Sequence, residues 1–466
     1  MRRVLLMSGT LLLAVTGSAA AQSVVCNVME RQGGSATISN AGLPTEFGVI
    51  YRAHFVCDGG QRTILADTAT YSRASGQIEL FGRAEVRDPE RILTAARATY
   101  FTQLRQLSAR GDVVVTDRST GSVIQGDVLT YLEETPTRPE SQITATATTG
   151  QARAILLSER TAEPGVTDTT IVDAAQINVV GERLFRGLGD AVMTRDSLKA
   201  SGFVIEYDQD SGVLVVSGNG LVEVPGYELR GDSITATVAE GEEIRDVLAR
   251  HNTSLHSEEM QVTAPALRLF FEEGEVSRMV ALPWEPAVPG TPVARASAVN
   301  DQFRMEADSL DVMAPGQRIE EAAAIGSAYV ERFTPDSVQA LLPEVDDAVL
   351  SLIAHDWVRG DTVRAFFTDG PPPAEEGAAA ERVLERLWAA GEPARTLHRT
   401  RDTNAGPDVP YSIAYLVGRE INVTFQDGAI AAVTASEDVR GVYLQPSDVA
   451  ARTTGSDTGQ PPPRQQ

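Results

Sequence analysis

Cysteine is almost missing from this chain, because only Cys26 and Cys57 occur among its 466 residues. A zinc site would need more ligands close by than these two thiols provide. A single pair of cysteines in an oxidising compartment more often forms a disulfide. We therefore expect a Cys26–Cys57 disulfide that ties the N-terminal segment to the chain after it, and no metal site.

Basic residues are also in short supply. Lysine and arginine together number 40 against 64 aspartates and glutamates, so the formal net charge is −24 at pH 7. A negative field of this size repels polyanions, which excludes nucleic acid as an expected partner. The same field makes it difficult for the protein to hold an anionic ligand by its head group alone.

Long apolar runs are absent after the first 21 residues. The chain begins MRRVLLMSGTLLLAVTGSAAAQS, with two arginines, an apolar stretch and then small residues, which is typical of a secretory signal peptide. The stretch is shorter than the roughly 20 apolar residues of a membrane anchor. We expect cleavage before Gln22, which removes Arg2 and Arg3 and takes the net charge from −24 to −26.

Catalytic motifs are missing as well. The chain contains no Walker loop, HExxH, GxSxG or CxxC sequence, and Gly218-Asn219-Gly220 lacks the third glycine of a dinucleotide loop. His251 and His256 are five residues apart, which suits neither one helix face nor a known metal spacing. We predict no catalytic residues and no cofactor, and therefore a protein that is not an enzyme.

A repeated phrase is what the chain does contain. An eight-residue pattern has Ala or Gly at its third place in every copy, and Asp follows that residue in five copies. Where insertions are absent the period is about 29 residues, which is typical of stacked supersecondary units. The ten copies are ILADTATY (64–71), LTAARATY (93–100), IQGDVLTY (124–131), VDAAQINV (172–179), ASGFVIEY (200–207), LRGDSITA (229–236), VTAPALRL (262–269), MEADSLDV (305–312), VRGDTVRA (358–365) and LVGREINV (416–423).

A second element lies between the copies. It has an apolar residue, a glycine, two or three further residues and then Val or a similar residue, as in FGRAEV (81–86), ARGDVVV (109–115) and IGSAYV (325–330). Turns between the two elements are marked by glycine or by polar clusters. Each unit is thus a strand, a turn and a strand, and the chain is predicted to be all-β with about ten such repeats.

The phase of the repeat indicates a bend inside the first strand. Apolar side chains occupy the first and third places and then the sixth and eighth, which a straight strand of period two cannot place on one face. A bulge at the small residue and its Asp shifts the facing by one residue. We expect the creases to line up along an edge, with Asp in a solvated structural role and no ligand.

The apolar places of the repeats form one predicted inner stripe. Either these side chains fill one another as a dry core, which is the more common outcome, or they line a groove. The stripe comprises Ile64, Tyr71, Leu93, Tyr100, Ile124, Leu129, Tyr131, Ile177, Val179, Ile205, Tyr207, Leu229, Ile234, Leu267, Leu269, Leu310 and Val312, and it continues through Val363, Ile421 and Val423.

The phrase LxADxAxY followed by GxIxLxGxAEVxD, together with the closing VRGVYLQP (439–446), resembles the OstA-like family of lipopolysaccharide-transport proteins, in particular its LptA-type periplasmic bridges. The resemblance implies an elongated antiparallel β-jelly roll with a V-shaped section, in which two facing half-sheets hold acyl chains. It implies a periplasmic location. The implied partners are lipopolysaccharide or a related glycolipid, other jelly-roll proteins of the transport system joined end to end, and the outer-membrane translocon.

The expected organisation follows from the repeats and the segments between them. The segments are a signal peptide (1–21), an N-terminal lead segment (22–46), an OstA-like jelly roll (47–333), a helical insertion with amphipathic spacing (334–357), further repeats that continue the roll (358–446) and a disordered Pro-rich tail (447–466). Acyl burial, at roughly 0.8 kcal/mol per methylene, would have to supply the binding energy in so acidic a protein.

Two other functions fit the same residues. One is an envelope scaffold with a closed core that binds other proteins through its outer face or its tail. The other is a polysaccharide-processing β-solenoid, which ranks last because the Asp residues recur once per repeat at a crease and so follow a structural period. A groove that holds a lipid would distinguish the carrier from the scaffold.

Overall fold

The computed structural model describes residues 26–28, 35–38, 47–72, 75–159, 165, 167–181, 183–195, 197–238, 244–257, 260–283, 294–333, 355–371, 382–400, 412–426 and 428–445. In these residues the chain forms 28 β-strands, two 3₁₀ turns (Asp58–Gly60 and Pro315–Gln317) and no α-helix. The strands pair in antiparallel fashion. The predicted all-β, antiparallel class is confirmed.

The chain divides into two compact units. Unit 1 comprises residues 1–196 and 204–211, and unit 2 comprises residues 197–203 and 212–466. The strands of unit 1 are β1 (Cys26–Val28), β2 (Ser35–Ile38), β3 (Phe47–Cys57), β4 (Arg62–Ser72), β5 (Gln77–Arg87), β6 (Arg91–Phe101), β7 (Gln106–Asp117), β8 (Val123–Leu132), β9 (Gln142–Thr146), β10 (Ala152–Glu159), β11 (Thr167–Ala174), β12 (Gln176–Val180) and β13 (Leu184–Arg195).

The division falls inside β14 (Leu198–Asp208), whose residues belong partly to each unit. The strands of unit 2 are β15 (Val213–Val224), β16 (Tyr227–Val238), β17 (Ile244–Ser257), β18 (Gln261–Glu272), β19 (Glu275–Leu282), β20 (Ala296–Val299), β21 (Phe303–Ala307), β22 (Ser309–Met313), β23 (Glu321–Arg332), β24 (Asp356–Asp369), β25 (Arg382–Thr400), β26 (Ser412–Gln426), β27 (Ala429–Ser436) and β28 (Arg440–Leu444).

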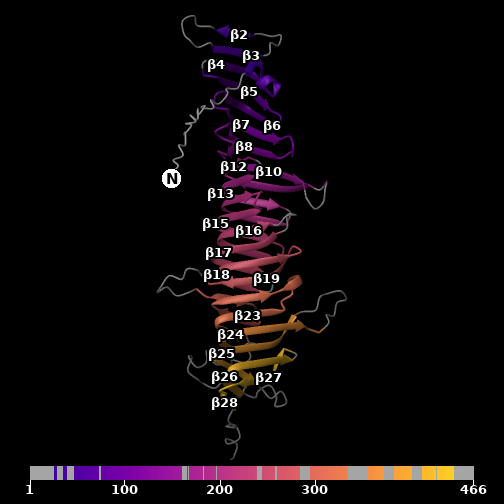
Figure 1. Ribbon diagram of the computed structural model, residues 1–466, viewed down its shortest axis with the longest axis vertical. Helices are drawn as coiled ribbons and strands as arrows, with labels where there is room; N and C mark the ends of the chain where they lie inside the picture. Colours follow the sequence, from indigo (N-terminus) through magenta and orange to yellow (C-terminus); the bar gives the residue numbers. More distant parts are fainter. Residues whose placement is uncertain are drawn as a thin grey trace, which may run out of the picture. The chain divides into compact units, whose positions relative to one another are not determined.

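The repeat predicted from the sequence corresponds to two strands. The ten copies of the first element lie on β4, β6, β8, β11 with β12, β14, β16, β18, β21 with β22, β24 and β26. The second element lies on the strands between them, such as β5, β7 and β23. Many of the long strands pair with the strand that follows them in the chain, as with β4 and β5, β16 and β17, and β24 and β25 (Figure 1).

Each long strand of unit 1 is divided into two arms. The register between β4 and β5 pairs 63–65 with 85–87 and 68–72 with 77–81, with a bulge between Leu65 and Thr68. The same shift separates Thr94 from Arg97 and Arg110 from Val113. We call the arm that contains the first half of β4 arm A and the arm that contains its second half arm B.

The two arms of unit 1 face each other across its interior. Phe55 lies on arm A and Tyr71 on arm B, yet their ring centroids are 6.2 Å apart. Inward side chains alternate with outward ones along each arm, as the burial pattern of β6 shows. The apolar core of the unit therefore lies between arms A and B.

Some strands break completely at the crease. In unit 1, β9 and β10 both pair with β8, and β12 and β11 both pair with β13. Because β9 also pairs with β12 and β10 with β11, the six strands form a closed ring of pairings. In unit 2, β18, β19, β22, β23, β21 and β20 form a second such ring.

The crease contains a bulge in β5, where 82–84 oppose 66–67 of β4. In β5, Gly82 and Arg83 have φ values of 73° and 44°, and Asp67 of β4 lies over them. A Cβ on Gly82 would lie 2.5 Å from Asp67 Oδ2, so glycine is required there. The inward positions of β4 shift at Ala66 and Asp67 as predicted, but the bulge itself lies on β5 and not at the small residue and its Asp.

The Asp residues of the repeat stabilise the crease. Asp67 accepts hydrogen bonds from the Arg83 guanidinium at 3.0 and 2.5 Å, and this lowers the pKa of Asp67. Asp127 accepts hydrogen bonds from the backbone N–H and the hydroxyl of Thr148, both at 2.6 Å, and its pKa is lowered for that reason. These contacts agree with a structural role for Asp.

The predicted disulfide is present, since Cys26 and Cys57 are bonded and join β1 to β3.

Three predicted segments lie wholly or mostly outside the described residues. The predicted signal peptide (1–21) and Pro-rich tail (447–466) lie outside the described residues. So does the predicted helical insertion, apart from its last three residues, of which the final two begin β24.

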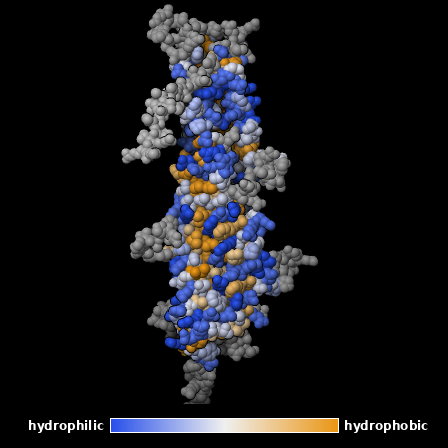
Figure 2. All heavy atoms as spheres, viewed as in Figure 1, coloured by the Kyte–Doolittle hydropathy of each residue, from blue (hydrophilic) through white to orange (hydrophobic). Residues whose placement is uncertain are grey.

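The faces of the two units that are visible in Figure 2 differ in hydropathy. Figure 2 shows hydrophilic side chains over most of the visible face of unit 1, whereas apolar side chains gather over unit 2 at the level of β15 to β19. Phe203, which is 60% exposed, is among the exposed apolar residues of unit 2. No helix within the described residues has the length and apolar character needed to cross a bilayer.

Candidate functional site

Unit 2 contains an apolar cavity of about 890 Å³. It lies between two arms, arm C and arm D, each formed by one part of β24 and the strands paired with it. Arm C contains the part of β24 before the register shift at Gly360 and Asp361, and arm D contains the part after it. The volume is within the usual range of ligand pockets, ≈ 300–1,000 Å³. Its lining comes from β21 and from β23 to β27.

Apolar side chains from both arms form the floor of the cavity. On arm C, Met305, Val330 and Val358 are aligned by strand register and are at most 5% exposed. On arm D, register aligns Ala365, Leu387 and Val423, which are at most 6% exposed. In a closed core, these inward side chains would contact those of the opposite arm. Here they form the walls of the cavity.

The tips of the two arms place polar side chains at the mouth. Arg332, Asp356 and His398 line the cavity from arm C, and Asp369 and Arg382 line it from arm D. Arg382 Nη1 lies 3.1 Å from Asp369 Oδ1. The cavity therefore has an apolar floor and a polar rim, which is the arrangement expected for an amphiphilic ligand.

His398 is the buried polar group of this rim. Its side chain is 8% exposed, and Nδ1 has no hydrogen-bond partner among the described residues. Burial lowers the pKa of His398, and the nearby Asp356 carboxylate opposes that shift. Since the pKa lies below its ordinary value, the imidazole is neutral at pH 7 and offers one donor and one acceptor.

Two contacts cross the mouth and cover part of the cavity. The Arg332 guanidinium of arm C lies 5.6 Å from the Phe425 ring of arm D and donates a hydrogen bond to the Gly428 carbonyl. The rings of Phe303 and Phe367, also from opposite arms, are 6.3 Å apart. The cavity is therefore roofed in places by contacts between single side chains.

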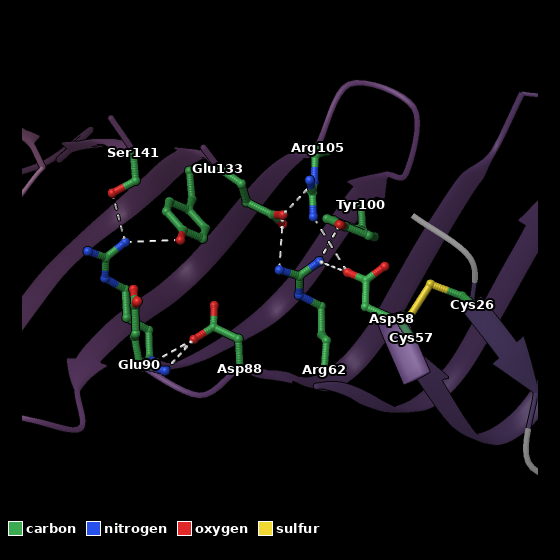
Figure 3. Close-up of polar contacts among 12 residues, drawn as sticks. Cys26, Cys57, Asp58, Arg62, Asp88, Glu90, Tyr100, Arg105, Glu133 and Ser141 are labelled. Carbon is green, nitrogen blue, oxygen red and sulfur yellow. Dashed lines mark hydrogen bonds and ion pairs between the residues drawn. A yellow bond between two sulfur atoms is a disulfide. The ribbon is translucent and has the colours of Figure 1, made fainter. Parts of the chain in front are cut away.

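Unit 1 has a mouth of the same kind, but it is closed (Figure 3). Arg62 of arm A donates a hydrogen bond to the Tyr100 hydroxyl of arm B and pairs with Glu133 at 3.0 Å. Arg105 lies 3.4 Å from Glu133 and 3.7 Å from Asp58, which links arm B back to arm A. Arg62 and Glu133 are both buried.

A second arginine of unit 1 makes the same kind of contact one repeat further along the chain. Arg91 donates hydrogen bonds to the Tyr131 hydroxyl at 3.0 Å and to Ser141 Oγ at 3.1 Å. Each arginine also lies over the ring of its tyrosine, at 5.1 Å for Arg62 and 5.2 Å for Arg91. Burial raises the pKa of Tyr100, and it raises that of Tyr131 to about 12.

The predicted groove residues are buried or half-buried. Four are half-buried, namely Tyr71, Tyr131, Val179 and Tyr207. The other thirteen are buried: Ile64, Leu93, Tyr100, Ile124, Leu129, Ile177, Ile205, Leu229, Ile234, Leu267, Leu269, Leu310 and Val312. Leu93 and Tyr131 line a small void of about 10 Å³ in unit 1, which is room for one water at most.

None of those seventeen residues lines the large cavity. Its walls come from the eighth, ninth and tenth copies of the repeat and from the second element between copies, as with Met305, Val423 and Val330. Val423 belongs to the predicted stripe, because its alternation with Ile421 indicates an inward side chain. His398 carries no sequence signal, because it lies in a long strand without the repeat phrase.

Within the described residues, no group of three or more His, Cys, Asp or Glu side chains is arranged to hold a metal ion. The chain matches no family model, and it matches none of the curated proteins. The function therefore has to be argued from the site itself.

Proposed function

We propose that this protein is a non-enzymatic lipid carrier or bridge of the bacterial envelope. In this proposal the two arms are the half-sheets of a V-sectioned jelly roll, and acyl chains of lipopolysaccharide or a related glycolipid lie between them. The observation that carries the proposal is the apolar cavity of about 890 Å³ with a polar rim in unit 2. Each buried methylene would contribute roughly 0.8 kcal/mol to binding.

The proposal also covers location and partners. A signal peptide (1–21) would direct the chain to the periplasm, where other jelly-roll proteins of the transport system would join it end to end. The outer-membrane translocon would receive the lipid. The sequence resemblance and the Cys26–Cys57 disulfide, which suits an oxidising compartment, support this placement.

Photocrosslinking inside the cavity tests the proposal. Phe367 and Phe425 line the cavity and are half-buried, so p-benzoylphenylalanine at either position preserves an aromatic ring there. We expect both probes to capture a lipid in cells, identified by mass spectrometry of the conjugate. Phe203, exposed and outside the cavity, is the matched control and should capture none. A folded protein whose cavity probes stay unlabelled would remove the basis of the proposal.

A scaffold function is the second candidate, and the closed mouth of unit 1 favours it for that unit. Arg62, Tyr100 and Glu133 join arms A and B directly, and the interior beneath them is packed. A scaffold binds protein partners without any lipid. Native mass spectrometry of the gently isolated protein separates the two candidates, since only the carrier retains a bound lipid mass.

A further inference from the structure

Two contacts join the tips of arms C and D across the mouth of the cavity. The ring of Phe303 on β21 lies against that of Phe367 on β24, with centroids 6.3 Å apart. The Arg332 guanidinium of β23 lies 5.6 Å from the Phe425 ring of β26 and donates a hydrogen bond to the Gly428 carbonyl. All five residues line the cavity. We call these two contacts the straps.

The straps cross the slit between the arm tips at two places. On arm C, Phe303 and Arg332 are opposite each other on neighbouring strands. On arm D, Phe367 lies on β24 and Phe425 on β26, with β25 between them. An amphiphile that has its polar head outside the tips and its tail between the arms cannot move along the slit past a closed strap.

The interior of unit 2 is packed beyond the strands that line the cavity. No described side chain of β15 to β20 lines the cavity. Leu229 of β16, Leu267 of β18 and Leu310 of β22 are at most 3% exposed, and none of them lines it either. An acyl chain in the cavity therefore has no apolar trough that leads on into this part of unit 2.

The straps are weak in comparison with the closed mouth of unit 1. Opening that mouth would separate the buried ion pair of Arg62 and Glu133, which is 3.0 Å long. Arg332 is only half-buried, and its strap partners are a ring and a neutral carbonyl. An aromatic pair or a partly exposed cation–π contact changes an equilibrium constant by only about two- to tenfold. The straps can therefore open while the arms stay folded.

We propose that the two straps form a gate, which must open for an acyl chain to enter or leave the cavity. The cavity then holds its lipid as a discrete cargo and not as part of a trough that continues through unit 2. This inference rests on the proposed function and narrows it, from a carrier or bridge to a carrier that is loaded and emptied through a gated mouth.

A covalent link across the mouth tests the inference in the full chain. Phe303→Cys and Phe367→Cys together place one thiol on each arm, and a bismaleimide with a hexane spacer joins them. The two native cysteines are bonded to each other and do not react. The probe is radiolabelled palmitoylglycerol, delivered from phosphatidylcholine vesicles. We expect the linked protein to take up and release it at least about tenfold more slowly than the same variant capped with N-ethylmaleimide.

The matched control places both thiols on one arm. Arg359 and Arg395 are exposed, lie opposite each other on β24 and β25 of arm C, and do not line the cavity. Linking Arg359→Cys to Arg395→Cys should leave both rates within about twofold of those of the capped form. Uptake through the linked mouth as fast as in its capped form would overturn the gate and leave the carrier function intact.

Loosening one strap should act in the opposite direction. Arg332→Ala removes the cation–π contact and the hydrogen bond to Gly428, so uptake and release of palmitoylglycerol should both become about three- to tenfold faster. The affinity should change less than about threefold, whereas loss of a residue that only holds bound lipid would speed release alone. The control Arg395→Ala should match the wild type. Unchanged rates in a folded R332A protein would contradict the role of Arg332 in the gate.

The failure of the proposed function looks different. If the wild type takes up neither palmitoylglycerol nor the anionic palmitoyl lysophosphatidate at equilibrium, the carrier function fails together with the gate. Ala365 lies in the floor at 2% exposure, and Ala365→Phe should abolish binding by filling the cavity. If the wild type binds lipid and a folded A365F protein binds it equally well, the ligand lies elsewhere and both assignments to this cavity fail.

Discussion

Tyr100 and Glu133 show how single residues close the interior of unit 1. Arg62 is a buried cation, and its partners across the mouth are a neutral hydroxyl and a carboxylate. A buried charge whose partner is removed is left uncompensated, which costs more than the loss of one neutral hydrogen bond. The carboxylate should therefore matter more to stability than the hydroxyl.

We predict that Glu133→Gln lowers the free energy of unfolding by about 2 kcal/mol, because the buried Arg62 loses its nearer carboxylate, at 3.0 Å, and keeps only Asp58 at 3.7 Å. Tyr100→Phe should lower it by about 1 kcal/mol, since it removes the hydroxyl acceptor and keeps the ring. Urea denaturation of both variants measures the two values. The control is Tyr51→Phe at an exposed tyrosine, and equal values for Glu133→Gln and Tyr51→Phe would show that the mouth contacts contribute nothing.

At the scale of the strand, the crease is a structural feature that recurs with the sequence repeat. Gly82 and Arg83 turn β5 in the left-handed region, and Asp67 from β4 covers the turn. Gly326 and Ser327 do the same in β23 beneath Asp308. Two separate causes require glycine here, the positive φ and the space that the Asp side chain already occupies.

We predict that Gly82→Ala destabilises unit 1 by about 2–3 kcal/mol, whereas Gly274→Ala costs about 1 kcal/mol. Both glycines have positive φ, but a Cβ on Gly274 meets nothing within 4 Å. The Asp67→Ala/Gly82→Ala double variant should be less destabilised than the sum of its single variants, because it relieves the contact. Thermal unfolding measures all four proteins. Strict additivity would mean that Asp67 does not crowd the crease.

The sequence repeat predicts some features of the fold and of the cavity but not others. Alternation and the phase shift at Ala66 and Asp67 reveal which side chains point inward and where the strand bends. They contain no information on the distance between the arms, which depends on how side chains of opposite arms meet. The sequence therefore could not tell the packed interior at Leu129 from the open one at Val423.

The polar contacts at the mouths of the two units could not be predicted from the sequence, for a related reason. Arg62 and Tyr100 are 38 residues apart and meet because arms A and B end at the same side of the unit. A spacing of this kind changes with every insertion between strands. His398 and Arg382 lie on one strand, but only the fold of β25 brings both of them to the mouth of one cavity.

At the scale of the whole molecule, the net charge of −24 acts on every approaching ligand. Its field favours neutral ligands and disfavours anionic ones, and salt screens it, since the Debye length falls from about 10 Å at 0.1 M to about 3 Å at 1 M. The side chains that line the cavity add no excess of positive charge that would reverse this field, because they include two arginines, Arg332 and Arg382, and three carboxylates, Asp356, Asp369 and Glu385.

Salt should therefore affect neutral and anionic lipids differently. We predict that the affinity for palmitoylglycerol changes less than about twofold between 0.1 and 1 M NaCl, beyond a small gain from stronger hydrophobic burial. The affinity for lysophosphatidate should rise by more than that, because screening weakens its repulsion from the protein. Titrations at both salt concentrations measure the two trends. An affinity for lysophosphatidate that falls steeply with salt would instead reveal a cationic clamp, and the argument from charge balance at the mouth would be wrong.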